Sequence, residues 1–440
     1  MTFRIHSIAG DLRTKIEQRT ATVAVIGLGY VGLSMAVELA KAGFSVLGID
    51  NDPERVELLK NSKSYILDVS TETLQAITSR FAAHADYDAL HHADVMIICV
   101  PTPLRKTKDP DLSFILAATT EIANFIEPGK LIILESTTYP GTTEEMILPE
   151  LQAGGLKAGT DFFLAYSPER IDPGNTQFRL FNTPKIVGGL TPQCGQLAEL
   201  LYSSICEKVI RVSNTKAAEM VKLLENTFRA INIGMVNEIA IMCDKLGIDT
   251  WEVIEAAATK PFGYMPFYPG PGLGGHCIPV DPHYLAWKLK TLNYSARFIE
   301  LAGEINSQMP GYIVSKITEA LNEQNKSVKG SSILVLGVAY KKDSNDLRES
   351  PALDILDMLL RKGADVAYND PYVNKLRLDS TTLVSTSFDA ALLQRSDCVV
   401  IITDHSHYDW QFVVDHAPLL VDTRNATRRV HSENCRVVKL

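Results

Sequence analysis

The sequence predicts an α/β protein of two Rossmann-like, doubly wound domains joined by a central helical domain with one long helix. Three observations support this. Short apolar, β-prone runs alternate with helical patterns in both halves of the chain. A helical pattern without internal proline runs between them, from Thr215 to about Leu246. Residues 23–53 and 333–371 echo each other, each reading strand, glycine, helix and a strand ending in Asp-Pro. The domains that we expect are 1–213, 214–325 and 326–440.

The first element is a βαβ unit. An apolar run at Thr22–Ile26 predicts a strand, and a helical pattern runs from Leu33 to Ala42. A second strand, Ser45–Ile49, leads into Asp50. Alternation of strands and helices after it indicates a mostly parallel sheet. The further strands that we expect in this domain are Val95–Val100, Leu131–Glu135, Phe162–Tyr166 and Lys185–Gly188.

The long helix has two readings that the sequence leaves open. Its apolar positions recur at helical spacing, which fits either a buried core helix or an oligomer interface between copies of the chain. Residues 259–282 are rich in proline and glycine and predict a loop. Helical patterns resume near His283 and continue, with a break around Asn293, to about Glu323. The C-terminal strands that we expect are Ile333–Val338, Val366–Tyr368, Cys398–Ile402 and Leu419–Val421.

Composition limits the function classes. The 440 residues are 46% hydrophobic, which is enough for sizeable cores and excludes a mainly disordered chain. The chain has 43 Lys plus Arg against 52 Asp plus Glu, and the resulting net charge of −9 disfavours non-specific electrostatic binding of nucleic acid. The seven cysteines are widely spaced without a C-x-x-C, so we expect no disulfide framework, no metal site and a reducing cytoplasm. We also expect no membrane span and no signal peptide.

The first glycine cluster has the context of a dinucleotide site. Gly27-x-Gly29-x-x-Gly32 lies between a predicted strand and helix, and Asp50 ends the next strand. The three glycines would permit a tight turn, close approach of a pyrophosphate and helix–strand packing. Asp50 would accept hydrogen bonds from ribose hydroxyls and repel a 2′-phosphate, which favours NAD over NADP. The alternative is a glycine-rich turn of another α/β protein. The cofactor-binding residues that we expect are Gly27, Gly29, Tyr30, Val31, Gly32, Asp50, Pro101, Thr102 and Thr137.

Cys277 is the strongest candidate for a catalytic nucleophile. Two glycines precede it, which would admit a substrate close to the backbone, and Asp281 follows it. A nucleophilic cysteine needs cationic or donor neighbours. Lys222 and Asn226 share one face of the long helix with Glu219 and could hold an oxyanion beside the sulfur. The alternatives are a buried small hydrophobic cysteine and a solvated lysine.

Glu169 follows the strand Phe162–Tyr166 in a turn that Pro168 sets. A glutamate at the end of a strand can orient a water or a substrate hydroxyl. A surface carboxylate paired with Arg170 is an equally good reading of the same spacing.

The chain resembles the UDP-glucose/GDP-mannose dehydrogenase family over nearly its whole length. The resemblance rests on GLGYVG at 27–32, VPTP at 100–103, EST at 135–137, SPER at 167–170, E-x-x-K-x-x-x-N at 219–226, GGHCIPVDP at 274–282, GVAYKKDSNDLRESPA at 337–352 and DTRN at 422–425. It implies an NAD-dependent, four-electron oxidation of the C6 alcohol of a nucleotide sugar to a carboxylate. It also implies a dimer or higher homo-oligomer and a C-terminal domain that binds UDP.

The resemblance assigns roles to residues. Cys277 matches the nucleophile that forms a thiohemiacetal and then a thioester. Lys222 and Asn226 match the residues that hold the C6 oxygen, and Asp281 matches the carboxylate that supports Lys222 and the water. Glu169 and Thr137 match residues implicated in positioning water and in proton steps. The substrate-binding residues implied are Glu169, Arg170, Lys222, Asn226, Tyr268, Gly272, Gly274, Gly275, Lys341 and Arg424, with Arg348 nearby.

Two departures from the UDP-glucose enzymes indicate the sugar. Pro173 stands where those enzymes have a second glutamate, and the cysteine loop reads GGHCIPVDP rather than GGSCF-x-KD. Both features are similar to the branch that acts on UDP-N-acetylhexosamines, with UDP-N-acetylglucosamine favoured and surface polysaccharide as the expected end use. UDP-glucose and the N-acetylgalactosamine and N-acetylmannosamine forms stay open, as do a one-step alcohol dehydrogenase and a non-catalytic NAD- or UDP-sensing protein.

Overall fold

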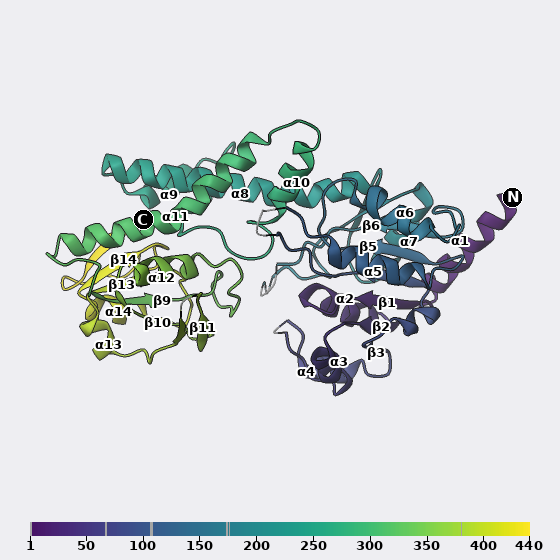
Figure 1. Ribbon diagram of the computed structural model, residues 1–440, viewed down its shortest axis with the longest axis horizontal. Helices are drawn as coiled ribbons and strands as arrows, with labels where there is room; N and C mark the ends of the chain where they lie inside the picture. The colour runs from purple at the N-terminus through teal and green to yellow at the C-terminus, as the bar shows by residue number, and fades with distance from the viewer. Residues whose placement is uncertain (1, 67, 106–108, 173–174, 176, 380) are drawn as a thin grey trace. The chain divides into compact units, whose positions relative to one another are not determined.

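The computed structural model describes residues 2–66, 68–105, 109–172, 175, 177–379 and 381–440 (Figure 1). The chain divides into two compact units. Unit 1 comprises residues 1–225 and 283–294, and unit 2 comprises residues 226–282 and 295–440. Of the three boundaries between them, two fall within helices, α8 (Thr215–Leu246) and α10 (Asp281–Lys290), and the third falls between Tyr294 and Ser295.

Unit 1 is built on an eight-stranded sheet in the order β3-β2-β1-β4-β5-β6-β7-β8. All neighbouring strands are parallel except β6 and β7. The strand order around β1 is that of a Rossmann fold. The strands are β1 (Thr22–Ile26), β2 (Ser45–Ile49), β3 (Phe81–His84), β4 (Val95–Ile98), β5 (Leu131–Leu134), β6 (Phe163–Tyr166), β7 (Lys185–Gly189) and β8 (Val209–Val212).

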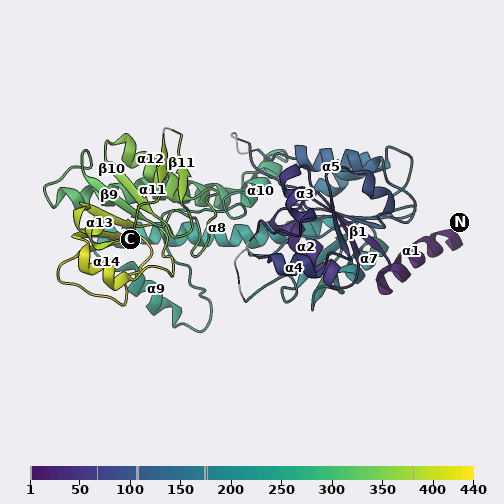
Figure 2. The same ribbon diagram turned by 90° about the horizontal axis from the view of Figure 1, so that it is seen from below.

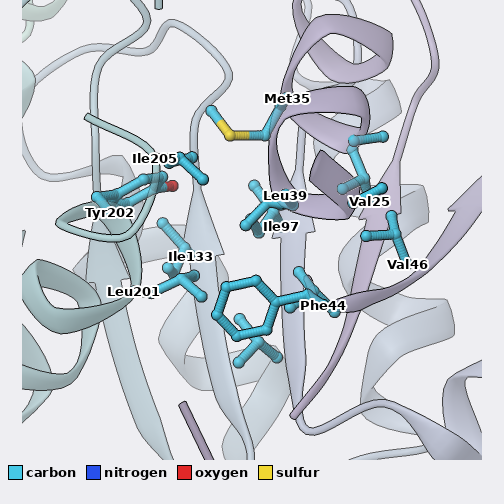
Figure 3. Packing of buried hydrophobic residues seen from close by; sticks show 14 of the residues in the cluster. Val25, Met35, Leu39, Phe44, Val46, Ile97, Ile133, Leu201, Tyr202 and Ile205 are labelled. Atoms are coloured by element: carbon cyan, nitrogen blue, oxygen red, sulfur yellow. The ribbon is translucent and has the colours of Figure 1, made fainter. Parts of the chain in front are cut away.

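The helices of unit 1 bury their apolar faces on this sheet. Phe44, Val46 and Ile97 pack with Met35 and Leu39 in one buried cluster (Figure 3). Fully buried strands explain why these runs are continuously apolar rather than alternating. The helices are α1 (Thr2–Glu17), α2 (Tyr30–Lys41), α3 (Pro53–Lys60), α4 (Thr71–Ala76), η1 (Asp88–His92), α5 (Ser113–Ala123), η2 (Thr143–Ile147), α6 (Leu148–Gln152) and α7 (Pro192–Tyr202).

Unit 2 has a five-stranded parallel sheet in the order β10-β9-β13-β14-β15. Alternate residues of β9 face opposite sides. Ile333 and Val335 pack with α11 and α12, and Leu334 and Leu336 pack with α13 and α14 (Figure 2). The elements are α9 (Thr250–Ala258), α11 (Arg297–Asn322), β9 (Ser332–Leu336), α12 (Pro351–Arg361), β10 (Asp365–Asn369), β11 (Lys375–Arg377), β12 (Thr382–Val384), α13 (Ala390–Arg395), β13 (Cys398–Ile401), α14 (Trp410–His416), β14 (Leu419–Asp422) and β15 (Arg436–Lys439).

The predicted fold class is confirmed, with the long helix at Thr215–Leu246. The break around Asn293 lies between α10 and α11, where Asn293 has a left-handed φ of +57°. The sequence analysis did not predict α1, β3, β8, β11, β12 or β15. Among the described residues, none of the helices combines the length and apolar character that crossing a membrane requires.

Candidate active site

The turn after β1 has the geometry of a dinucleotide site. Gly27 adopts φ +89°, and a Cβ there would lie 2.8 Å from the Cys99 carbonyl oxygen. A Cβ on Gly32 would lie 1.8 Å from the Gly27 carbonyl oxygen, so the turn and α2 can be this close only with glycine there. A Cβ on Gly29 would meet nothing within 4 Å. No side chain caps the N-terminus of α2, and a helix N-terminus favours an anion. These features fit the pyrophosphate of NAD.

Asp50 lies at the end of β2, beside this turn. It is 5% exposed. Its Oδ2 accepts from the Leu28 N–H at 2.8 Å, and its Oδ1 accepts from the Asp52 N–H at 2.9 Å. The Arg55 guanidinium lies 3.5 Å from Oδ2. Because a carboxylate has about four acceptor positions, Asp50 has capacity left for ribose hydroxyls.

The loops after β4 and β5 are held together at the same edge of the sheet. The Ser136 hydroxyl donates to the Val100 carbonyl at 2.7 Å. Pro101 is exposed, whereas Thr102 is buried and its carbonyl accepts from the Tyr284 hydroxyl at 2.9 Å. Ligands of such sheets bind at the carboxyl ends of strands, so Pro101 and Thr102 lie where the cofactor prediction needs them.

Thr137 and Lys222 are brought together. The Lys222 ammonium donates to the Thr137 hydroxyl at 2.5 Å, and both residues are buried. The alternative of a solvated Lys222 is therefore wrong. Glu219, one turn earlier on α8, accepts from the Gly141 N–H at 2.5 Å and from both the N–H and the hydroxyl of Thr143. Burial raises the pKa of Glu219 to about 7. Glu219 thus anchors the loop that follows Thr137 to the helix that carries Lys222.

Glu169 is buried, so the alternative of a surface carboxylate is wrong. Its Oε1 accepts from the Arg170 and Ile171 N–H groups at 2.7 and 2.6 Å. Its Oε2 lies 3.0 Å from the Lys185 ammonium, which also lies 3.1 Å from Glu135. The sequence analysis missed Lys185. Its only signal was a lysine opening an otherwise apolar strand.

Arg170 is bound within unit 1. Its guanidinium lies 2.7 Å from Glu225 and donates to the Pro184 carbonyl at 2.5 Å. Its partner is therefore Glu225 rather than the Glu169 carboxylate, and its contact with Glu169 is through the backbone N–H.

In unit 2, predicted site residues gather around Asp281. The Asn226 amide donates to Asp281 at 2.6 Å, and both residues are buried. The Asp281 N–H donates at 2.8 Å to the carbonyl of Cys277. Cys277 therefore lies one turn before α10, and it is half-buried rather than closed off in a core. None of the chain's seven cysteines, all of which are described, is in a disulfide.

The glycines before Cys277 are required by a neighbouring side chain. A Cβ on Gly274 would lie 2.4 Å from the Tyr340 Cβ, and a Cβ on Gly275 would lie 2.8 Å from the Tyr340 ring. The Gly275 N–H also donates to the Arg348 carbonyl at 2.9 Å. Tyr340 thus occupies the side of these glycines where a Cβ would point, and the approach of a substrate to this loop stays a prediction. The loop after β9 supports the cysteine loop.

The remaining predicted substrate residues are spread over unit 2. The Tyr268 ring stacks on Trp251 with centroids 6.0 Å apart, and Gly272, with φ +135°, leaves room for Pro351. Lys341 is half-buried. Arg424 lies 3.5 Å from Asp404. Pro173, which we used to infer the sugar, lies outside the described residues. In the described part of the chain, no three His, Cys, Asp or Glu side chains gather in a group that could hold a metal ion.

Family models match the chain in three consecutive segments. All three describe the UDP-glucose/GDP-mannose dehydrogenase family. The NAD binding domain matches residues 21–206, the central domain 216–308 and the UDP binding domain 334–429.

Individual relatives agree with this. The chain is 38% identical to UDP-N-acetyl-D-glucosamine 6-dehydrogenase of Pseudomonas aeruginosa over 80% of this chain and 83% of that protein. It is 35% identical to UDP-N-acetyl-D-mannosamine dehydrogenase of Pyrococcus horikoshii over 92% and 95%. A solved structure described as UDP-D-ManNAc dehydrogenase from Pyrococcus horikoshii superposes with a TM-score of 0.86 at 33% identity, covering 95% of this chain and 99% of that one.

Proposed function

The chain belongs to the UDP-glucose/GDP-mannose dehydrogenase family and is an NAD-dependent UDP-sugar dehydrogenase, and from this premise we propose that it oxidises the C6 hydroxyl of a UDP-N-acetylhexosamine to the uronic acid. The observation that carries the proposal is the family's catalytic set, intact in sequence and held by buried contacts: Thr137 with Lys222 at 2.5 Å, and Asn226 with Asp281 at 2.6 Å. A non-catalytic protein would have no need to keep a buried ammonium and carboxylate in these places.

The overall reaction is a four-electron oxidation. One sugar alcohol, two NAD⁺ and one water give one carboxylate, two NADH and three protons. Bound NAD supplies the hydride acceptor in each of the two oxidations. The Gly27–Gly32 turn and the N-terminus of α2 would hold its pyrophosphate, and Asp50 its ribose.

The chain's own residues would carry the covalent steps. The Cys277 sulfur adds to the C6 aldehyde and gives a thiohemiacetal, which a second oxidation turns into a thioester. Cys277 lies one turn before α10, and a helix N-terminus favours an anion such as a thiolate. Lys222 and the second N–H of the Asn226 amide would stabilise the C6 oxygen. Water then forms the new C–O bond, the C–S bond breaks, and the thiol regains a proton.

Glu169 is proposed to orient that water. Its two oxygens already accept three hydrogen bonds, so it acts here as an ionised acceptor with one position left. Retaining the aldehyde on sulfur would prevent release of a reactive intermediate between the two oxidations.

The sugar is proposed to be N-acetylated, and UDP-N-acetylglucosamine is the first candidate because that relative is 38% identical. UDP-N-acetylmannosamine is a second candidate, supported by the superposition at a TM-score of 0.86 with a protein described as acting on it. An NADH absorbance assay with UDP-linked glucose, N-acetylglucosamine, N-acetylgalactosamine and N-acetylmannosamine tests this. Preference for UDP-glucose would overturn the argument from Pro173.

Further parts of the proposal concern the whole chain. We propose the domain division 1–213 for NAD, 214–325 for the central helices and 326–440 for UDP, and a cytoplasmic enzyme that serves surface polysaccharide synthesis. We also propose a homodimer. On α8, Leu223 is buried, but Met220, Leu224 and Phe228 are 37%, 60% and 46% exposed, an apolar stripe that a second copy could cover. Sedimentation velocity at micromolar concentration tests this, and a monomer would overturn it.

Cys277→Ser tests the covalent route. Because serine is a much weaker nucleophile, we expect acid formation to fall by at least 10³-fold. NADH should be formed in a 2:1 ratio to acid by the wild type, and mass spectrometry should find the sugar as a thioester on Cys277 after rapid acid quench. Cys243→Ser, at a buried cysteine outside the site, is the matched control and should keep activity. Undiminished acid formation by the Cys277 variant would remove this residue from the mechanism.

A further inference from the structure

Three ionisable side chains meet in unit 1 with almost no solvent. The Lys185 ammonium lies 3.1 Å from Glu135 and 3.0 Å from Glu169, and the three side chains are 2%, 0% and 6% exposed. The Tyr202 hydroxyl donates to Glu135 as well, and the ammonium lies 5.1 Å from the centroid of the Tyr202 ring. These four residues are called the Lys185 cluster below. The cluster includes Glu169, yet neither the glycine motifs nor the cysteine loop predicts it.

The antiparallel strand explains how the cluster forms. β7 runs against β6, with Tyr166 opposite Gly188 and Ala165 opposite Gly189. Continuing this register three residues beyond Tyr166 puts Glu169 opposite Lys185. Because β7 is reversed, its first residue lies at the sheet edge where β5 and β6 end, and Glu135 directly follows β5. A parallel β7 would have placed Lys185 at the far edge.

The cluster's charges are unequal. Two carboxylates share one ammonium, and an uncompensated charge at this depth is costly, so the cluster favours keeping one proton. Burial, together with the charge of Glu169, raises the pKa of Glu135 to about 7. Burial alone would also raise the pKa of Glu169, but the charge and hydrogen bond of Lys185 and the Ile171 N–H lower it below its usual value. The proton therefore belongs on Glu135 and the negative charge on Glu169.

Other groups face the cluster from the neighbouring elements. Lys222 of α8 also lowers the pKa of Glu169. Cys99, after β4, and Cys206, after α7, have pKa values that burial raises, so both face the cluster as neutral thiols. Tyr202 belongs to the apolar cluster of unit 1, with Ile133, Leu201 and Ile205 (Figure 3). Lys185 and Lys222 are thus the cations that act on Glu169.

We propose that Lys185 is a positioning residue for the hydrolysis of the thioester, which keeps Glu169 ionised and fixes its orientation while Glu135 carries the compensating proton. This inference rests on the proposed function, in which Glu169 orients the attacking water. In that step the water oxygen bonds to the thioester carbon, the carbon–sulfur bond breaks, and the proton that the water loses restores the Cys277 thiol. A protonated Glu169 could not accept this water's hydrogen bond in the same way, so hydrolysis would depend on Lys185.

Lys185→Met tests the inference through the pH dependence of hydrolysis. Without the ammonium, burial and Glu135 should raise the pKa of Glu169, so the acidic limb of the hydrolysis rate should move to higher pH by at least one pH unit. At pH 6 the rate should fall by at least 10-fold, with a smaller loss at pH 9. The measurement is the rate at which the thioester on Cys277, formed from UDP-N-acetylglucosamine and NAD, disappears in rapid-quench mass spectrometry.

The matched control is Lys130→Met. Lys130 is also a buried lysine of unit 1, and its ammonium lies 3.4 Å from Glu127. It precedes β5, whereas the Lys185 cluster lies at the other end of that strand. The Lys130→Met substitution should lower stability but leave the acidic limb of the hydrolysis rate in place. Because Lys185→Met leaves two buried carboxylates, the double variant Lys185→Met/Glu135→Gln is made as well. It removes one of them and should show the same displaced limb.

The Glu135→Gln variant tests the role of Lys185 even if the methionine variants do not fold. It is nearly isosteric and leaves Lys185 to Glu169 alone, so the limb should stay in place or move to lower pH. A limb at higher pH in this variant, or a wild-type limb in a folded methionine variant, would overturn the role of Lys185. These outcomes are distinct from failure of the proposed function, in which Cys277→Ser would still form acid and no thioester would be found in the wild type.

Discussion

The two units contain the same kind of turn after their first strand, β1 or β9, but the turn has a different role in each unit. Gly27 and Gly337 each follow the strand that comes first in the chain in their sheet, β1 and β9, with φ +89° and +78°. Their N–H groups donate to Ile49 at 2.8 Å and to Asn369 at 2.9 Å. The aspartate after the second strand accepts the next N–H in both cases, Asp50 at 2.8 Å and Asp370 at 2.7 Å. The echo in the sequence is therefore structural.

The register of the echo corrects the sequence analysis. We matched the two Asp-Pro pairs, but Asp50 corresponds to Asp370, so Asp52-Pro53 and Asp370-Pro371 are two residues out of step. After the turn the units differ. α2 begins three residues beyond Gly27, whereas α12 begins only at Pro351.

The residues after the turn explain the difference in use. Ala339 and Lys342 stand where the first turn has Gly29 and Gly32. Tyr340, the counterpart of Tyr30, packs on Gly274 and Gly275 of the cysteine loop. The second turn has thus lost the glycines that admit a pyrophosphate and a close helix, and its loop supports the cysteine instead. Four substitutions test this comparison.

Gly32→Ala should have the largest effect. Its Cβ would lie 1.8 Å from the Gly27 carbonyl oxygen, so the turn and α2 must separate. We expect either no folded protein or a loss in kcat/KM for NAD of at least about 100-fold, with unfolding free energy lowered by ~3 kcal/mol or more. Thermal unfolding and NADH kinetics measure both. The control is the counterpart Lys342→Ala, an exposed side chain that should change neither. A fully active Gly32→Ala protein would contradict the assignment.

Gly29→Ala should separate binding from folding. Gly29 has φ −69°, which any residue adopts, and its Cβ would meet no protein atom within 4 Å. The melting temperature should stay within about one degree, because the second turn already holds an alanine at this position. The pyrophosphate, however, needs that space, so KM for NAD should rise about 10-fold or more while kcat changes little. Unchanged affinity for NAD, measured by calorimetry, would place the pyrophosphate elsewhere.

The sequence could predict those parts of the molecule whose signal is local. The Gly27–Gly32 turn and the helix from Thr215 each carry their pattern within one segment, and both were predicted. Lys185 was not, because its place depends on the reversed direction of β7, which apolar runs do not encode. Tyr340 was missed because the space that it fills lies beside glycines 66 and 65 residues earlier in the chain, Gly274 and Gly275. The expected approach of Cys277 to Lys222 stays a prediction.

Asp50→Asn and Asp370→Asn should give the smallest and most selective pair of effects. Asp370 accepts from four backbone N–H groups, those of Val338, Ala339, Tyr372 and Val373, and lies 3.0 Å from His405 Nε2. Because His405 Nδ1 accepts the Asp343 N–H, Nε2 carries the proton and donates it to Asp370. Asp370 is therefore fully used inside the protein. The Asp370→Asn substitution should lower the unfolding free energy by about 1–3 kcal/mol and leave KM for NAD unchanged. The Asp50→Asn substitution should raise KM for NAD several-fold.

The dependence of the unfolding free energy on acidic pH gives a further test of the role of Asp370. Burial alone would raise the pKa of Asp370, but the hydrogen bonds from His405 and from the Val338 and Tyr372 N–H groups hold it below its usual value. A carboxyl with a lowered pKa in the folded state contributes stability above its unfolded pKa and loses it as pH falls through the folded value. In urea unfolding followed from pH 7 down to pH 3, the Asp370→Asn protein should therefore lose less stability than the wild type over the lowest part of that range. An equal loss in both proteins would mean that Asp370 is not held ionised by these contacts, and the likeness of the two turns would then stop at their backbones.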